Sequence, residues 1–259
     1  SELYHHAFYE APSIRKIGDT YYLVYSSGEN NELDYATSPY PDRDFTYRGV
    51  IISNADLGYK GNTTPKAPAG TIHGGIECIN GQWYVFYHRC TNNTDFSRQA
   101  CAEPITIMPD GTIPQVEITT QGLAGKPIIA KGNISAAYAC NLTTGKKMKL
   151  GNGKPQTQPR ITEFDGDVFV ADLADGTEVG YKYFDFQNES ALRITHRGTG
   201  TGALEVRTDS KLLGSIAVTP SENWTDSEGT IAFPAGVHGL YLCYRGTGKL
   251  DLKEIGFEE

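Results

Sequence analysis

The sequence predicts an all-β fold in two parts: blades of a partial β-propeller, followed by a C-terminal β-sandwich of the jelly-roll kind. Three observations predict it. The 259 residues include 16 Tyr, 10 Phe and 29 Gly, which favour short strands and tight turns. A stretch near the N-terminus repeats after 62 residues, and turn residues divide the second half into short segments. No segment keeps a helical period.

The repeat consists of two hairpins with the same order of aromatic and turn residues. Residues 14–27 read IRKIGDTYYLVYSS, and residues 76–89 read IECINGQWYVFYHR. The offset of 62 places Gly18-Asp19 over Asn80-Gly81. Asn-Gly is a preferred type I′ hairpin turn because both central residues need a positive φ. Each copy therefore predicts a strand, a two-residue turn and an aromatic strand.

Two more strands are expected after each hairpin. In the first copy they are 32–38 and 45–53, and in the second they are 96–101 and 105–108. Four antiparallel strands that repeat in this way form a propeller blade. The alternative is two similar hairpins in one sandwich. Because a propeller needs about four to eight blades, we expect the missing N-terminal blades to come from upstream sequence or from another chain.

The second part begins after a connector at 121–132 that contains Gly and Pro, QGLAGKPIIAKG. The predicted domains are therefore residues 1–127 and 133–259. Turn residues every 8–12 positions separate alternating strands, as in an antiparallel sandwich. The expected strands are 167–173, 181–186, 191–196, 202–208, 214–218, 239–244 and 250–257.

Composition excludes several classes of partner and cofactor. The net charge is −8 and the pI is near 5.3, which argues against nucleic acid. No apolar run approaches the ~20 residues of a membrane span, so no membrane partner is expected. The glycine-rich segment 198–202 joins two expected strands, so no organic cofactor is expected. The five cysteines include no CxxC pair and are expected to be buried thiols.

Two polar residues stand where the first strand of each repeat begins. Glu10 lies in FYEAPSI and His73 in GTIHGGI, so both would lie close to the propeller axis. A carboxylic acid among aromatic and apolar neighbours is desolvated, and desolvation raises its pKa, as a general acid requires. The alternatives are an exposed loop carboxylate and a structural histidine.

Three stretches together carry a family resemblance: FYEAPSIRKIGDTYYLVYSS, IHGGIECINGQWYVFYHR and FSRQACAEPI. They resemble the C-terminal part of the catalytic domain of glycoside hydrolase family 43, over about residues 3–130. That family is a five-bladed propeller of inverting enzymes, mostly β-xylosidases and α-L-arabinofuranosidases. The resemblance implies two to three of the five blades, and activity on arabinose- or xylose-containing plant polysaccharides or oligosaccharides, as in xylan degradation.

The resemblance also implies roles for single residues. Glu10 matches the catalytic acid, and Phe8 in the same phrase is a candidate substrate contact. His73 matches a histidine that coordinates a central hydrated metal, usually Ca²⁺, or lines the sugar pocket. Arg98 matches an arginine that contacts substrate, with a plain ion pair as the alternative. Three neighbours are expected to be structural: His88, Arg89 and Glu103.

An inverting enzyme also needs a base that activates water on the opposite face of the sugar. In the resembled family this base is an aspartate of the first blade, and a second aspartate orients the acid. The resemblance implies that both precede Ser1. We therefore expect this chain alone to be inactive. The alternative is a non-catalytic carbohydrate-binding or scaffolding protein.

The second part is similar to carbohydrate-binding module family 6. The similarity rests on GYKYFDF at 180–186, on Trp224 and on PAGVHGLYL at 234–242. Such modules hold a sugar between two aromatic faces, for which Tyr181 and Trp224 are the candidates.

One position departs from that family pattern. Lys249 stands where the family often has an asparagine that binds sugar hydroxyls, which favours a bracing role for the module. The module's implied calcium ligands are guessed as Glu163 and Asp251. A polysaccharide substrate favours secretion or the periplasm, whereas unpaired cysteines favour a reducing interior.

Overall fold

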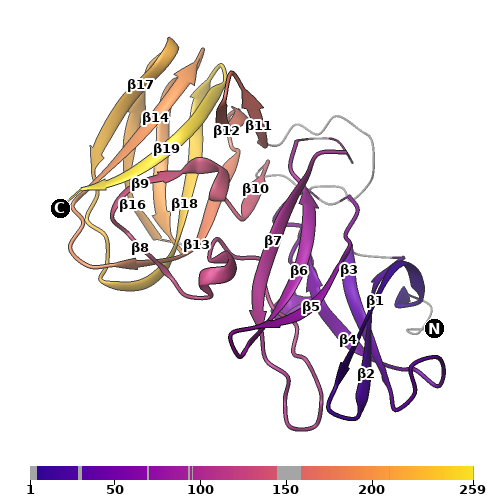
Figure 1. The fold of residues 1–259 in the computed structure, drawn as a ribbon. Coiled ribbons are helices and arrows are strands. Elements are labelled where there is room, and N and C mark those ends of the chain that lie inside the picture. The colour runs from indigo at the N-terminus through magenta and orange to yellow at the C-terminus, as the bar shows by residue number, and fades with distance from the viewer. Residues whose placement is uncertain are drawn as a thin grey trace. The chain divides into compact units, whose positions relative to one another are not determined.

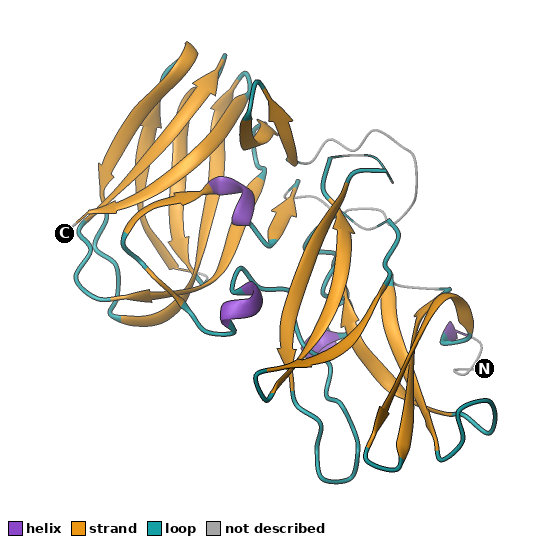
Figure 2. Ribbon diagram, viewed as in Figure 1, coloured by secondary structure: helices purple, strands orange, loops and turns teal. Residues whose placement is uncertain are grey.

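The computed structural model is built almost wholly of strands, which confirms the all-β class (Figures 1 and 2). It describes residues 5–28, 31–68, 70–92, 94, 96–144, 159–209 and 211–258. The helical elements that lie wholly among the described residues are short 3₁₀ turns: η1 (Tyr59–Gly61), η2 (Gly122–Ala124) and η3 (Ala136–Tyr138). Over the described ranges, no helix has the length and apolar character needed to cross a membrane.

The chain divides into two compact units, which we describe separately. Unit 1 comprises residues 1–90, 94–118 and 149–154, and unit 2 comprises residues 91–93, 119–148 and 155–259. The sequence placed the division in the connector at 121–132. In the structure Thr120 is already tied to unit 2, because its Oγ1 accepts a hydrogen bond from the backbone N–H of Lys182 at 3.0 Å.

The first sheet of unit 1 is the four-stranded antiparallel meander predicted for a propeller blade. Its strands, in spatial as well as chain order, are β1 (Phe8–Ile17), β2 (Thr20–Ser27), β3 (Glu32–Ser38) and β4 (Thr46–Ser53). The turn between β1 and β2 is Gly18-Asp19, as expected, with Gly18 at φ 57°.

The second sheet has three strands: β5 (Gly74–Ile79), β6 (Gln82–Cys90) and β7 (Arg98–Ile105). The register confirms the repeat, because Ile14 faces Leu23 in the first sheet and Ile76 faces Val85 in the second. The expectation of a fourth strand at 105–108 is wrong. The chain turns there instead, and the backbone N–H of Gly111 donates to the carbonyl of Met108 at 2.8 Å.

Unit 2 is a sandwich of two sheets with one apolar core (Figure 1). The first sheet runs β10 (Asn141–Thr143), β13 (Glu178–Phe186), β18 (Gly236–Thr247), β15 (Thr201–Thr208), β16 (Lys211–Val218), with β8 (Ile128–Ile129) beside β13. The second runs β11 (Arg160–Phe164), β12 (Asp167–Leu173), β19 (Leu250–Glu258), β14 (Ala191–Gly198), β17 (Ser221–Thr230), with β9 (Gly132–Ser135) beside β19. All seven strands expected in this half are present.

The five cysteines all lie in the described part of the chain, and none forms a disulfide. Cys90, Cys140 and Cys243 are buried, as expected. Cys78 is exposed on β5 and Cys101 is half-buried, so the expectation of buried thiols is wrong for Cys78. Burial raises the pKa of the Cys243 and Cys101 thiols, which keeps both protonated near neutral pH.

Candidate functional site

Glu10 and His73, the two polar residues that the repeat singled out, meet in unit 1. Nε2 of His73 lies 2.7 Å from Oε1 of Glu10, although 63 positions separate the two residues. Glu10 comes from β1, where it pairs with Ser26 of β2, and His73 directly precedes β5. An imidazole at this distance can donate to the carboxylate or accept its proton, depending on the tautomer.

The two glycines that follow His73 allow this meeting. A Cβ atom at Gly74 would collide with the carbonyl of Phe86, and a Cβ atom at Gly75 would collide with the hydroxyl of Ser13. Ser13 lies on β1, so the absence of a side chain at Gly75 lets β5 approach the strand that carries Glu10. The HGG sequence therefore places His73 beside the carboxylate for a steric reason.

The backbone around Glu10 is irregular. The register of β1 against β2 shifts on both sides of Glu10, and Ala11 has φ 57°. Such bulges turn a side chain away from the regular alternation of a strand and are common beside active sites. A non-glycine residue in the left-handed region costs free energy, so the surrounding sheet must hold Ala11 there.

His88 completes the cluster, although the sequence predicted it to be merely structural. Its Nδ1 accepts the backbone N–H of His73 at 3.3 Å, and its Nε2 lies 3.0 Å from Oγ1 of Thr71. Burial, together with the charges of Arg98 and His73, lowers the pKa of His88 to about 4. His88 is therefore neutral at pH 7, and it fixes the backbone from which His73 reaches Glu10.

A signal for His88 was present in the sequence. The offset of 62 places His88 over Ser26, which is the residue that faces Glu10 across the β1–β2 hairpin. Carrying that pairing into the second hairpin brings residue 88 opposite the start of β5, where His73 stands. The repeat could therefore have predicted this contact if the cross-strand register had been used.

The expected desolvation of Glu10 is not found. The side chain of Glu10 is 44% exposed and that of His73 is 35% exposed, so water reaches both. The aromatic residues beside Glu10 are open too, with Phe8 55% and Tyr9 68% exposed. The ring of Phe8 lies 5.8 Å from that of Tyr25. Its exposed part is accessible for contact with a ligand.

Arg98 begins β7 opposite Cys90. It is exposed, and its charge contributes to the low pKa of His88, so it lies within electrostatic reach of the cluster. The structure therefore brings Glu10, His73 and Arg98 into one neighbourhood of unit 1.

The described side chains supply no complete calcium site around His73, so calcium there stays a prediction. Calcium takes six to eight oxygen ligands. Among the His, Cys, Asp and Glu side chains of the described residues, no group of three that could hold a metal ion includes His73. The guessed module ligands also stay predictions: both oxygens of Asp251 accept protein hydrogen bonds, and Glu163 is exposed on β11.

Tyr181 is not a sugar-stacking residue, which corrects the prediction. Its side chain is 0% exposed, and its hydroxyl donates to the carbonyl of Ala136 at 3.0 Å. Its ring packs 6.2 Å from that of Phe184 within the core of the sandwich. Tyr181 lies on β13 in the inward-facing set of side chains, so no ligand can reach the ring.

Trp224 lies on the edge strand β17 and is surrounded by charged side chains. Its Nε1 donates to Oδ2 of Asp167 at 2.7 Å. The guanidinium of Arg197 stands 4.3 Å from the ring centroid, and Nζ of Lys253 stands 5.6 Å from it. Trp224 is therefore half-buried beneath cations, and it does not form an aromatic pair with Tyr181.

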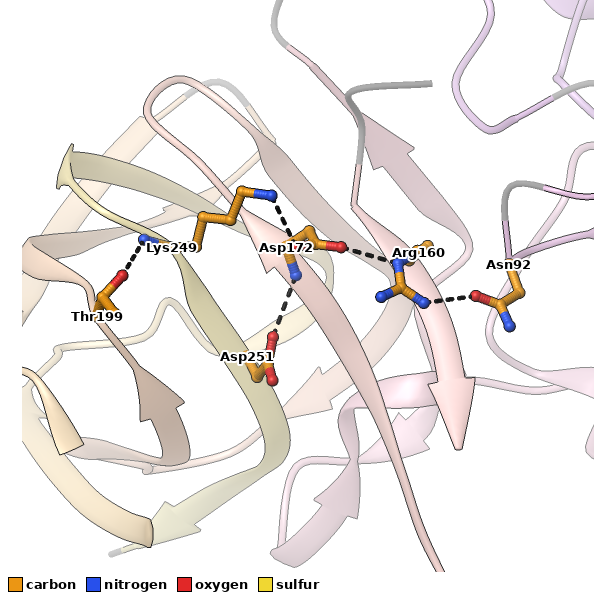
Figure 3. A network of polar contacts seen from close by, with 6 residues as sticks. All are labelled: Asn92, Arg160, Asp172, Thr199, Lys249 and Asp251. Carbon is orange, nitrogen blue, oxygen red and sulfur yellow. Dashed lines mark hydrogen bonds and ion pairs between the residues drawn. The ribbon is translucent and has the colours of Figure 1, made fainter. Parts of the chain in front are cut away.

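Lys249 is held in a polar network of unit 2 (Figure 3). Its Nζ donates to Oδ1 of Asp172 at 2.9 Å, and Oδ2 of Asp172 accepts from Nε of Arg160 at 2.8 Å. Arg160 in turn donates to Asn92 at 2.8 Å. Burial alone would raise the pKa of Asp172, but the hydrogen bonds from Lys249 and Arg160 lower it below the ordinary value. The amine at this position is thus paired with Asp172, although the side chain of Lys249 is 65% exposed.

Comparison with known proteins agrees with this architecture. Residues 151–259 match the family model of the carbohydrate binding module (family 6). A xylosidase/arabinosidase of Thermoclostridium stercorarium is 45% identical over 264 residues, covering 96% of this chain and 56% of that protein. The chain resembles glycoside hydrolase family 43 joined to carbohydrate-binding module family 6.

Two further proteins extend the comparison. An arabinoxylan arabinofuranohydrolase of Paenibacillus polymyxa is 26% identical, covering 95% of this chain and 40% of that protein. The crystal structure of a family 43 arabinoxylan arabinofuranohydrolase from Bacillus subtilis, in complex with cellotetraose, matches with a TM-score of 0.51 at 20% identity. It covers 97% of this chain and 54% of that one, which confirms the fold of partial propeller and sandwich. The chain spans about half the length of these relatives.

Proposed function

We propose that this chain is the C-terminal part of an inverting glycoside hydrolase that acts on arabinose- or xylose-containing plant polysaccharides or oligosaccharides. Glu10 is its general acid. The observation that carries the proposal is the 2.7 Å contact between Glu10 and His73. The names of the 45% and 26% identical relatives, a xylosidase/arabinosidase and an arabinoxylan arabinofuranohydrolase, support the substrate class.

The chemistry divides between the two oxygens of Glu10. His73 holds Oε1, and Oε2 delivers the proton to the glycosidic oxygen as the bond to the leaving sugar breaks. His88 fixes the backbone of His73 through its Nδ1, so it is a positioning residue. Phe8 offers an exposed ring to the apolar face of a sugar, and Arg98 offers a cation to its hydroxyls.

We propose that the general base comes from a segment outside this chain. An inverting enzyme places its two carboxyl groups roughly 6.5–9.5 Å apart, with water between the base and the sugar. The blades that complete the propeller would supply that base, so the 259 residues alone are proposed to be inactive. They would become active when joined to the remaining part of the Thermoclostridium stercorarium relative.

That chimaera tests the role of Glu10. Glu10→Gln should lower turnover of xylo- and arabino-oligosaccharides by about 10²–10⁴-fold, because a sugar leaving group needs a proton. Turnover of a dinitrophenyl glycoside should change little, because this leaving group departs without one. Glu77→Gln is the matched control, since Glu77 is a half-exposed carboxylate on the neighbouring strand β5. Equal losses on both substrates would remove Glu10 from the acid role.

A second candidate function is sugar binding by unit 2, which the family match of residues 151–259 favours. Trp224 is then the aromatic contact, since Tyr181 is buried. Titration of the chain with xylo-oligosaccharides should give a heat signal that Trp224→Ala abolishes and that Tyr138→Ala, at a 56% exposed aromatic of the same unit, leaves intact. If wild type gives no signal, the module braces rather than binds.

A further inference from the structure

A second cluster of ionisable side chains lies in unit 1, apart from Glu10 and His73. It consists of His6, Glu32 and Asp34, whose ligand atoms all lie within 4.8 Å of one another. Nδ1 of His6 lies 2.9 Å from Oδ2 of Asp34 and 3.6 Å from Oε2 of Glu32. Glu32 and Asp34 are alternate residues of β3, so both point to the same face of the sheet. His6 reaches them from the chain just before β1.

The two carboxyl groups are buried. Asp34 is 0% exposed and Glu32 is 3% exposed. Oδ1 of Asp34 is a buried oxygen with no hydrogen-bond partner, and it belongs to the same carboxylate that faces His6. A buried oxygen of this kind is costly, because it has lost water and gained nothing in return. It calls for a ligand that a histidine and two carboxylates can share.

The electrostatics of the cluster favour a cation. The hydroxyl of Tyr25 donates its hydrogen bond to the carbonyl of His6, not to a carboxylate. One imidazole thus faces two carboxylates, and a metal ion would balance their charge.

The donor set selects the class of ion. One imidazole nitrogen with two carboxylate oxygens suits divalent first-row transition metals, whereas calcium prefers oxygen ligands alone. Bonds of 2.0–2.1 Å in a tetrahedron place neighbouring ligand atoms about 3.3 Å apart. The distances of 2.9 and 3.6 Å from Nδ1 of His6 lie on either side of that value. The His6 ring is already oriented by stacking on Tyr47, with centroids 4.9 Å apart.

We propose that His6, Glu32 and Asp34 bind a divalent first-row transition-metal ion such as Zn²⁺, through Nδ1 of His6 and one oxygen of each carboxylate. The ion would tie the segment before β1 to β3. Because His6 stands two positions before Phe8, it would fix the start of the strand that carries Glu10. The site is structural, and it does not depend on the catalytic role of Glu10.

The test uses the whole chain, freed of metal with a chelator and titrated with Zn²⁺ in a calorimeter at pH 7.5. Wild type should bind one equivalent at this site. His6→Ala and Asp34→Asn should weaken that binding by at least the roughly 10- to 100-fold that loss of an outer-shell partner costs. His238→Ala is the matched control, because Nδ1 of His238 lies 3.2 Å from Asp209 in an exposed pair. It should leave this binding unchanged, as should His73→Ala.

Co²⁺ gives a second readout that reports the ligands directly. The wild-type chain should develop the visible absorption of a bound Co²⁺ ion, and His6→Ala should lose it while keeping the wild-type circular dichroism. The proposal is overturned if wild type binds neither Zn²⁺ nor Co²⁺, or if His6→Ala binds them as wild type does. Binding of Ca²⁺ in their place would also overturn it. No sugar or turnover is measured, so failure here leaves the proposed hydrolase untouched.

Discussion

The two units place their charged groups in opposite ways. Unit 1 buries two carboxyl groups side by side, at Glu32 and Asp34, with a histidine as their neighbour. Unit 2 fills its core with aromatic rings and keeps the Lys249–Asp172–Arg160 network partly exposed. Desolvated charge costs stability and provides chemistry, whereas ring packing provides stability alone. The comparison places the two adjacent buried carboxyl groups in unit 1 and the cluster of buried aromatic rings in unit 2.

The largest expected effect tests the aromatic core of unit 2. Phe184 is 0% exposed, and its ring lies 5.0 Å from that of Phe257 and 5.8 Å from that of Phe186. Phe184→Ala should lower the free energy of unfolding by about 3–5 kcal/mol, because it leaves a cavity among rings that cannot close. Denaturant unfolding measures the loss. Phe164→Ala, at a ring of the same unit that is 66% exposed, should cost far less. Similar losses for both variants would contradict the packing account.

The next effect tests the buried carboxyl groups of unit 1. Burial raises the pKa of Asp34 from 3.8 to about 7. Between these values the folded chain keeps a proton that the unfolded chain has lost, so stability should fall as the pH rises. The slope is roughly 1.4 kcal/mol per pH unit, and the penalty is complete above about pH 7. The groups facing Asp34 are His6, Glu32, Ser27 and Tyr25.

The measurement compares wild type with Asp34→Asn in chelator at pH 5 and pH 8. The low pKa of His88 works in the opposite direction in both proteins, so it cancels in their difference. The free energy of unfolding of Asp34→Asn should increase relative to that of wild type as the pH rises. Added Zn²⁺ should remove this increase. A stability difference between the two proteins that does not change with pH would mean that Asp34 ionises at little cost in free energy. The buried charges of unit 1 would then behave like the partly exposed network of unit 2.

Much of this fold could be predicted because its signals are local. The period of 62 residues fixed the register of both hairpins, and Asn80-Gly81 fixed the second turn. The same offset placed Glu10 and His73 where the first strand of each repeat begins, but not their contact. Each of these depends on residues close in sequence or on a repeat that can be counted.

The errors arose where a distant contact decides the outcome. The strand β17 was not among the expected strands, because it is polar along most of its length. Its Gly229 lies close to β16, where a side chain would collide with the carbonyl of Ser215. Tyr181 was assigned to the surface, but the register of β13 against β18 shifts between Tyr181 and Phe184, and both rings are buried. The cluster of His6 with Asp34 joins residues 28 positions apart through no motif. Sequence patterns predict which face of a strand is apolar, but not which charges a fold brings together.

The smallest expected effect compares one ion pair from each unit. Arg15 and Glu77 stand at the same position of the two repeats and lie 3.1 Å apart, with side chains 44% and 50% exposed. Arg160 and Asp172 lie 2.8 Å apart in unit 2, at 32% and 34% exposure. Exposed pairs contribute roughly 0–1 kcal/mol, because water screens them and both side chains lose freedom.

Double-mutant cycles to alanine should therefore give a small coupling for Arg15 with Glu77 and a somewhat larger one for Arg160 with Asp172, which also binds Lys249. Raising the salt concentration should reduce the first coupling more than the second. A coupling between Arg15 and Glu77 well above 1 kcal/mol would mean that charges on its surface join the two sheets of unit 1. The stability of this unit would then depend on ion pairs, and the contrast with the ring-packed sandwich would be greater than burial alone implies.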